Sequence, residues 1–281
     1  MIYNSYAKIN LHLAVGPKRE DNYHNLQSIF AKIDLFDTLE LDAKISDKLN
    51  IKIEGLEDCH IKGEDTITKA VRLWCEKTNN LLNVKIKLTK RIPIQAGLGG
   101  GSSNAATALL ALNDIFSLKN LNKNELLTLA LEVGSDVPFF LSDIPFAYIE
   151  GRGEKITPLK NTFDYNIYLI KPPIGSSTKG AFERLDNIER KPFKSKQEII
   201  DIFNNGLESW KEEFYNDFEL VIESAVLKSL RVDKLNFSSM SGSGSTCYVL
   251  CNKSNNCYNK ITFLGKFKDK NYTKSCVFQN I

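Results

Sequence analysis

The residues whose types and spacing best suit chemistry are four glycines crowded into five positions. The clustered glycines are Gly97, Gly99, Gly100 and Gly101. Glycine loses more conformational freedom on folding than any other residue, so such a cluster needs a local reason. We expect positive φ angles in this loop, or a close approach by a group about the size of a phosphate.

A helix is predicted directly behind the glycines. Apolar residues recur there at helical spacing, at Ala105, Leu109, Leu112 and Phe116. Ser102 or Ser103 is expected to cap the start of this helix. The N–H groups of the first turn and the positive end of the helix dipole would then face the loop. The sequence therefore predicts an anion site that requires no lysine.

Other phosphate-binding loops fit this segment poorly. A Walker A loop needs lysine after its last glycine, and here Ser102 follows Gly101. The dinucleotide fingerprint G-x-G-x-x-G also fails at Ser102. A protein-kinase loop would lead into a strand and be followed by His-Arg-Asp and Asp-Phe-Gly motifs, which the chain lacks. A flexible hinge would not be expected to lead straight into an alanine-rich helix.

The elements around this loop are read from hydrophobic periodicity. Alternation from Ala7 to Val15 predicts a strand whose polar face carries Lys8, Asn10 and His12. That face could meet solvent or form the floor of a cleft, and the pattern alone favours solvent. The other elements predicted in this half are strands at 29–41, 49–53, 84–88 and 146–149 and a helix over 66–77. This order is typical of an α+β fold.

The remaining chain predicts a second lobe after a turn at Gly151-Arg152-Gly153. We therefore divide the chain into residues 1–150 and 151–281. Ser195 and Glu198 form a capping box that announces a helix. The other predicted elements are helices over 217–232 and near 255–264 and strands at 167–170, 235–240, 246–251 and 272–278.

Composition excludes several classes of protein. The chain has 281 residues, with 37 basic and 34 acidic side chains, so its net charge of +3 provides no strong field for a nucleic-acid polymer or an anionic membrane. No apolar run approaches the ~20 residues that span a bilayer. The six cysteines are interpreted as reduced thiols of a cytoplasmic protein. A metal site at Cys247, Cys251 and Cys257 is the alternative, but the spacing fits no zinc pattern.

The loop resembles the phosphate-binding motif of the GHMP small-molecule kinases, which include galactokinase, homoserine kinase and mevalonate kinase. Residues 93–106 match the family pattern P-x-x-x-G-L-G-x-S-S-A, except for the extra Gly101 and for Asn104. Both departures are typical of members that act on a cytidine diphosphate-linked methylerythritol, and blocks at 7–11, 21–30, 134–140, 216–219 and 241–245 agree. The resemblance covers the whole chain. It implies a ribosomal-protein-S5-like N-terminal lobe and a ferredoxin-like C-terminal lobe, with the active site between them.

The resemblance also implies a reaction and a donor site. The reaction is ATP-dependent phosphorylation of the 2-hydroxyl of that methylerythritol, in the non-mevalonate isoprenoid route. Asp136 is the implied base, and Lys8 pairs with it and steadies the developing alkoxide. The ATP phosphates would be held by Pro93, Ile94, Gln95, Ala96, Gly97, Leu98, Gly99, Gly100, Gly101, Ser102 and Ser103. Mg²⁺ is expected on the phosphates, with Ser102 or Ser103 as the nearest hydroxyl. Without the resemblance, a turn or capping role is the better interpretation of Asp136.

The implied acceptor site lies mainly in residues 21–30. His24 is assigned to the cytosine edge, and Tyr23 and Phe182 to its two faces. The full set is Asn10, Tyr23, His24, Phe30, Thr178 and Phe182. His12 is interpreted as a structural histidine, and Asn22 replaces a glycine but tolerates a left-handed backbone.

Two further segments bear on the site. Asp65 or Thr66 stands where the family commonly has an adenine-binding asparagine, so that contact is not carried over. Residues 241–245 are either a plain hairpin turn or a loop that lies against the phosphate loop.

Three alternatives remain open at the level of the sequence. They are another acceptor such as mevalonate or homoserine, a non-catalytic ligand sensor on the same fold, and an RNA-binding module. No basic stripe with interleaved aromatics supports the last of these. We expect a small-molecule substrate, no nucleic-acid or membrane partner, and a monomer or weak homodimer.

Overall fold

A computed structural model describes residues 1–59, 63–117, 121–160, 165–172, 176–222, 228, 237–252 and 275–277. These residues form two compact units that are each discontinuous in sequence. Unit 1 comprises Met1–Ala7, Leu35–Ile94 and Gly99–Asp143, and unit 2 comprises Lys8–Asp34, Gln95–Leu98 and Ile144–Ile281. The division into lobes near residue 150 stays a prediction. In the described part of the chain, no helix is both long and apolar enough to span a membrane.

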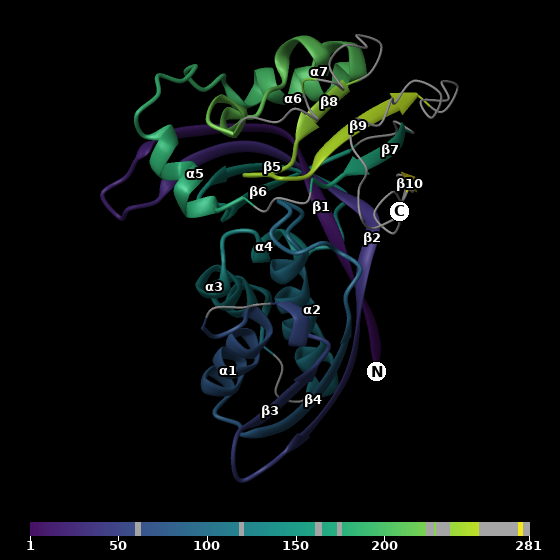
Figure 1. The fold of residues 1–281 in the computed structure, drawn as a ribbon. Coiled ribbons are helices and arrows are strands. Elements are labelled where there is room, and N and C mark those ends of the chain that lie inside the picture. Colours follow the sequence, from purple (N-terminus) through teal and green to yellow (C-terminus); the bar gives the residue numbers. More distant parts are fainter. Residues whose placement is uncertain are drawn as a thin grey trace. The chain divides into compact units, whose positions relative to one another are not determined.

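Unit 1 consists of strands covered on one face by helices (Figure 1). The later half of β2 (His24–Ile45) pairs antiparallel with β4 (Leu82–Thr89), and β3 (Asn50–Glu54) pairs parallel with β4. Buried and exposed residues alternate strictly along β4, which is why its period-two pattern was readable. The helical segments are η1 (Glu57–Cys59), α1 (Thr66–Thr78), α2 (Gly100–Ile115), α3 (Lys123–Val133) and α4 (Val137–Phe140).

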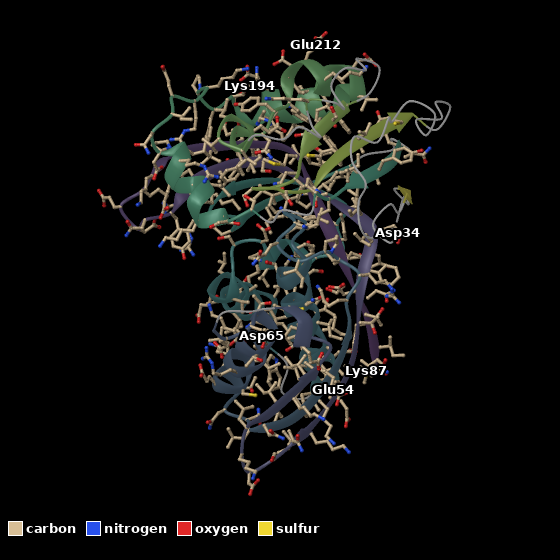
Figure 2. All side chains as sticks on the ribbon, in the orientation of Figure 1. Asp34, Glu54, Asp65, Lys87, Lys194 and Glu212 are labelled. Atoms are coloured by element: carbon tan, nitrogen blue, oxygen red, sulfur yellow. The ribbon has the colours of Figure 1, made fainter. Side chains whose placement is uncertain are left out.

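The ends of the unit 1 helices follow from local chemistry. The Asp65 carboxylate accepts hydrogen bonds from the first-turn N–H groups of Ile67 and Thr68, and so caps α1 (Figure 2). A capping box begins α3, and Gly134 ends it. Helix α4 begins at Val137 with Pro138 in its first turn. Proline suits this position because its fixed φ fits the first turn of a helix.

Unit 2 contains two sets of paired strands. The early half of β2 pairs with β5 (Phe146–Gly151), which pairs with β6 (Lys155–Leu159). A second sheet has the order β10-β7-β9-β8, with β10 at Ser275–Val277, β7 at Tyr165–Ile170, β9 at Cys247–Asn252 and β8 at Phe237–Met240. The helical segments are α5 (Thr178–Leu185), α6 (Lys196–Asn205), α7 (Leu207–Glu213) and η3 (Asp217–Leu220). The opening strand, β1 (Ile2–Lys18), contributes to both units.

Most predicted elements of unit 2 are present. The Ser195–Glu198 capping box starts α6, and β7 and β9 fall where apolar runs indicated. Strand β6 was missed because it is short and contains Pro158. The helix expected over 217–232 begins as the 3-10 turn η3, and much of its remainder lies outside the described residues, as does the helix near 255–264. Of the strand at 272–278, the structure describes 275–277.

The cysteines differ from the sequence interpretation at one position. Cys59, Cys75 and Cys247 are buried free thiols, and burial raises the pKa of Cys75 to about 11, which keeps it unreactive. Cys251 is disulfide-bonded, so the expectation of six reduced thiols was wrong. Cys257 lies outside the described residues. Among the residues that are described, no group of three or more His, Cys, Asp and Glu could hold a metal ion.

Candidate active site

The glycine-rich loop leads into helix α2 with no side-chain cap. Gly99 occupies the N-cap position with φ of 68°, and no side chain bonds to the first-turn N–H groups there. The prediction that Ser102 or Ser103 caps the helix was therefore wrong, because both serines lie inside the first turn. The consequence favours the predicted anion site, since a glycine N-cap leaves the first-turn N–H groups available to a ligand.

Close packing explains the extra glycine in unit 1. The Thr66 hydroxyl donates a 2.8 Å hydrogen bond to the Gly101 carbonyl, and a Cβ at Gly101 would meet Thr66 Oγ1 at 3.3 Å. Thr66 therefore joins the start of α1 to the start of α2. This contact gives a structural role to Thr66, which stands near the position where the family commonly has an adenine-binding asparagine.

The two loop serines have different surroundings. Ser103 is buried, and its Oγ accepts a 2.8 Å hydrogen bond from the Ser5 hydroxyl. Ser102 is half-buried in the same turn. Of the two hydroxyls suggested for a metal ion on the phosphates, that of Ser102 is the better suited, because Ser103 already serves as an acceptor inside the protein.

The chain that enters the loop is held by Asp37, a residue that sequence reasoning missed. Asp37 is fully buried, and its Oδ1 accepts the N–H groups of Arg91 and Ile92 at 2.7 and 2.8 Å. Its Oδ2 accepts from Lys90 Nζ. The sequence signal for Asp37 was that a charged residue stands between Leu35 and Leu39, on the apolar side of the alternating pattern of β2. The network fixes the backbone just before Pro93, where the loop begins.

In unit 2, the first part of the loop contacts the β8–β9 hairpin. The Ser241 hydroxyl donates a 2.8 Å hydrogen bond to the Gly97 carbonyl, and the Thr246 N–H bonds the Ala96 carbonyl at 3.3 Å. Gly97 has φ of 74°, and a Cβ there would lie 1.9 Å from the Ser241 carbonyl oxygen. Residues 241–245 thus form a hairpin turn and also pack against the glycine loop, as the resemblance implied.

Asn216 supports that hairpin from a distant part of the sequence. Its Nδ2 donates to the carbonyls of Met240 and Gly242 at 2.7 and 2.8 Å, and its Oδ1 accepts the Phe218 N–H at 3.0 Å. A buried amide with both ends bonded is strongly oriented. The 216–219 block therefore maintains the hairpin that packs on Gly97.

The polar face of β1 is buried, which corrects the solvent-exposed interpretation. Lys8 Nζ donates to Asn10 Oδ1 at 2.7 Å and lies 4.5 Å from the centre of the Phe30 ring. Asn10 Nδ2 donates to Ser28 Oγ at 3.0 Å, and Ser28 donates to the His12 carbonyl at 2.5 Å. This series of bonds fixes which way the Asn10 amide points, and so fixes the oxygen that Lys8 contacts.

His12 is a structural histidine, as predicted. Its ring packs against Phe214 and Tyr215, and its Nδ1 lies 3.4 Å from the Tyr215 N–H. Burial, with a smaller contribution from the positive charge of Lys194, lowers the pKa of His12 to about 3. The ring is therefore neutral in the folded protein at any pH well above that value.

Asp136 stands at the N-cap position of α4, directly after the turn that follows Gly134. Its side chain makes no capping hydrogen bond to that helix. Of the two alternative interpretations of Asp136, the capping role is therefore not realised, whereas the residue does lie in the turn before α4.

The predicted acceptor residues of unit 2 lie among several charged groups. His24 stacks on Phe182 with ring centroids 4.8 Å apart, and its Nε2 lies 2.7 Å from Asp186 Oδ1. The Arg152 guanidinium lies 3.8 Å from the centre of the exposed Tyr23 ring. Sequence reasoning missed Asp186 and Arg152, which come from segments more than a hundred positions along the chain and carried no motif.

Two further predictions for the acceptor site concern the backbone of Asn22 and the position of Thr178. Asn22 has φ of 65°, which confirms that it preserves the left-handed turn expected of a glycine. The Thr178 hydroxyl lies 2.8 Å from the Ser243 hydroxyl, so the start of α5 is tied to the β8–β9 hairpin.

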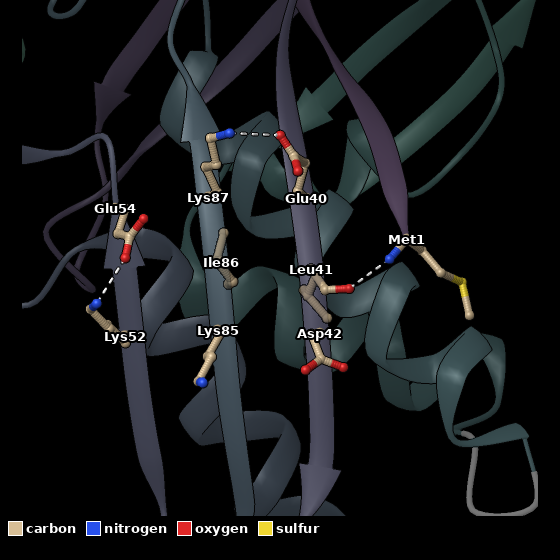
Figure 3. Close-up of a pocket in the computed structure, with 9 residues that line it drawn as sticks. All are labelled: Met1, Glu40, Leu41, Asp42, Lys52, Glu54, Lys85, Ile86 and Lys87. Atoms are coloured by element: carbon tan, nitrogen blue, oxygen red, sulfur yellow. Dashed lines mark hydrogen bonds and ion pairs between the residues drawn. The ribbon is translucent and has the colours of Figure 1, made fainter.

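A separate hollow of about 480 Å³ lies on the outer face of unit 1, over β2, β3 and β4 (Figure 3). Its charged lining residues are Glu40, Asp42, Lys52, Glu54, Lys85 and Lys87. Ion pairs join Lys52 to Glu54 at 2.8 Å and Lys87 to Glu40 at 3.4 Å. None of the predicted site residues lines this hollow. Its three carboxylates stand among three lysines and the Met1 ammonium, a mixture of both signs as on a solvated face.

Comparison with known proteins agrees with these features. Residues 65–148 match the family model of the GHMP kinases N terminal domain. The 4-diphosphocytidyl-2-C-methyl-D-erythritol kinase of Clostridium tetani (strain Massachusetts / E88) is 37% identical over 93% of this chain and 95% of that protein. The protein of the same name from Prochlorococcus marinus (strain AS9601) is 36% identical over 95% of this chain and 91% of its own length.

Solved structures show the same relationship. A crystal structure of 4-(cytidine 5'-diphospho)-2C-methyl-D-erythritol kinase superimposes with a TM-score of 0.71 at 29% identity, covering 89% of this chain and 90% of that one. The Methanococcus jannaschii mevalonate kinase, at 17% identity and a TM-score of 0.61 over 90% of this chain and 91% of that one, shares the fold. The chain is therefore a small-molecule kinase of two-lobe α+β GHMP fold and belongs to the 4-diphosphocytidyl-2-C-methyl-D-erythritol kinase family.

Proposed function

We propose that the protein transfers the γ-phosphoryl group of ATP to the 2-hydroxyl of 4-diphosphocytidyl-2-C-methyl-D-erythritol, a step of the non-mevalonate isoprenoid route. The observation that carries the proposal is the glycine loop with an uncapped helix start, in a chain 36% identical to a kinase of that name. GHMP kinases use ATP as their phosphoryl donor. Peptide N–H groups at the start of α2 suit a polyphosphate, because they bind negative charge without a lysine.

Asp136 and Lys8 have separate roles in the proposed reaction. Asp136 takes the proton from the acceptor hydroxyl as the oxygen attacks the γ-phosphorus and ADP leaves. Lys8, oriented by Asn10 and by the Phe30 ring, provides the positive charge that stabilises the developing alkoxide. Their pairing stays a prediction.

Mg²⁺ is part of the proposal. We assign one ligand to the Ser102 hydroxyl, because the Ser103 hydroxyl is bonded to Ser5. When bound, the ion would neutralise part of the charge on the phosphates. Most of its other ligands would be phosphate oxygens and water, because Mg²⁺ at phosphate-bearing sites usually keeps several waters.

The acceptor is proposed to bind through its cytidine diphosphate group. Aromatic side chains at Tyr23 and Phe182 suit the faces of a base, and base stacking contributes ~1 to 3 kcal/mol. His24 is proposed to meet the edge of the base. Mevalonate and homoserine lack a base, so an aromatic site of this kind would serve neither of them. Because the reaction draws on ATP, we also propose a cytoplasmic location.

A coupled assay of ADP release tests the proposal against its rivals. The purified full-length protein is given ATP, Mg²⁺ and, in turn, the cytidylyl substrate, mevalonate and homoserine. Release with the cytidylyl substrate alone is the expected result. Release with mevalonate or homoserine would assign the site to another acceptor, and release with none would indicate a non-catalytic ligand sensor.

A further inference from the structure

One turn of helix α5 holds the His24 ring in two ways. Phe182 stacks on the imidazole, with 19° between the ring planes. Asp186, four positions further along, brings its Oδ1 to 2.7 Å from His24 Nε2. Residues four apart lie on the same face of a helix, so a single turn sets both the plane of the ring and its rotation within that plane.

Helix α5 is a firm support for this contact. Ala181 and Leu185 are fully buried in an apolar cluster that includes Leu13 and Phe218. Phe182 also makes an edge contact with Phe218 at 4.8 Å. The His24 side chain is only 6% exposed, so its ring cannot turn without disturbing this packing.

The contact with Asp186 determines which nitrogen of His24 carries hydrogen. An ionised carboxylate can only accept a hydrogen bond, so Nε2 must be the donor. In the neutral ring the other nitrogen, Nδ1, then presents a lone pair. A lone pair pairs with an amino group and is repelled by a carbonyl oxygen. Cytosine carries an amino group at the position where uracil carries a carbonyl oxygen.

We propose that Asp186 is a positioning residue that sets the hydrogen-bonding polarity of His24, so that Nδ1 accepts from the amino group of a bound cytosine and discriminates against uracil. The inference rests on the proposed function, because it requires that a cytidine diphosphate group binds beside His24. It adds a source of base selectivity on α5, outside the block of residues 21–30. With uracil in the same place, two acceptors would face each other and both would lose a partner.

Titration calorimetry with CDP and UDP tests the inference on the full-length protein. Wild type is expected to bind CDP roughly tenfold or more tighter than UDP, since a buried unpaired acceptor costs ~1 to 3 kcal/mol. In Asp186→Ala the ring is no longer held in one tautomer, so the ratio of the two dissociation constants should fall several-fold toward one. Glu183→Ala is the matched control, because Glu183 is an exposed carboxylate on the same helix, and it should leave the ratio unchanged.

A double variant separates positioning from general stability. If Asp186 acts through His24, adding Asp186→Ala to His24→Ala should change the ratio no further. Should Asp186→Ala fail to fold, Asp186→Leu replaces it, since its side chain fills a similar volume and can neither accept from nor donate to Nε2. A wild-type protein that binds neither nucleotide would contradict the proposed function itself. Wild-type preference for CDP that persists in the folded Asp186 variants would overturn this inference alone.

Discussion

At the scale of single residues, the proposed chemistry depends on one carboxylate. Asp136 lies at the start of α4 without capping it, so its replacement by asparagine removes no helix cap. We expect Asp136→Asn to lower kcat at least about a hundredfold, because a positioned base contributes ~10² to 10⁴ in rate. ATP-analogue binding should remain close to wild type. Asp143→Asn, at an exposed carboxylate that follows α4, is the matched control and should keep the wild-type kcat. A wild-type kcat in Asp136→Asn would contradict the assignment of Asp136 as the base.

His12 predicts a specific dependence of stability on pH. Its pKa is about 3 in the folded protein and 6.5 in the reference state, so the unfolded chain binds a proton that the folded chain does not. Above pH 6.5 the ring is neutral in both states, so the full free energy of unfolding is present. As pH falls from 6.5 toward about 3, the unfolded chain gains a proton and the free energy of unfolding falls. The expected loss is about 1.4 kcal/mol per pH unit in that window.

Replacing the His12 imidazole isolates its contribution to the pH dependence of stability. His12→Phe keeps an aromatic side chain against Phe214 and Tyr215 but cannot bind a proton. Urea unfolding across the window should therefore show a shallower fall in stability with acidification for the variant. Parallel curves for the two proteins would show that His12 does not titrate on unfolding.

At the scale of elements, the glycine loop and the β8–β9 hairpin depend on each other. Gly97→Ala would place a Cβ 1.9 Å from the Ser241 carbonyl oxygen at a positive φ, so the loop or the hairpin must move. We expect ATP-analogue affinity to fall at least about tenfold, because a small displacement of the N–H groups spoils their alignment with phosphate.

Gly63 offers a matched control for this substitution. It also has a positive φ, 82°, but a Cβ there would meet nothing within 4 Å. Gly63→Ala should therefore show only the backbone cost of about 1 kcal/mol, with unchanged affinity for the analogue. Equal loss of affinity in the two variants would contradict the role given to the Gly97–Ser241 contact.

Hydrophobic periodicity was sufficient to predict most strands and helices, but not their caps or the burial of their polar faces. Strand β4 and helix α1 followed the period-two and helical patterns because each has one buried face. The predicted cap of α2 was wrong because Gly99 occupies the N-cap position, which a serine often fills. The alternation of β1 alone favoured a solvent-exposed polar face, and only the resemblance placed Lys8 in the site, since alternation shows that one face is apolar but cannot show that Lys8 is buried as well.

At the scale of the whole molecule, ligand binding should be visible as stability. A non-hydrolysable ATP analogue at a hundredfold its dissociation constant should raise the free energy of unfolding by about 2.7 kcal/mol. The analogue should shift the unfolding midpoint of wild type and Asp136→Asn alike, and that of Gly97→Ala less. No shift in wild type would contradict an ATP site in this chain.

Motifs revealed more of the candidate site than of the residues that support it. The glycine loop, Lys8 and Asp136 lie in short segments whose composition or resemblance singles them out. Asp186 has no such signal, and Asp37 is marked only as a charged residue within the alternation of β2, because each acts on a partner tens to hundreds of positions away. Such contacts exist only once the strands and helices are paired, so they could not be read from the sequence.

The most direct test of the central claim is the identity of the product. ATP labelled in its γ-phosphoryl group is incubated with the protein and 4-diphosphocytidyl-2-C-methyl-D-erythritol, and the product is analysed by mass spectrometry and phosphorus NMR. We predict one labelled phosphoryl group on the 2-hydroxyl, and at least about a hundredfold less of it when Asp136→Asn replaces wild type for the same time. An unlabelled acceptor in the presence of wild-type protein, or label on mevalonate or homoserine instead, would contradict the account.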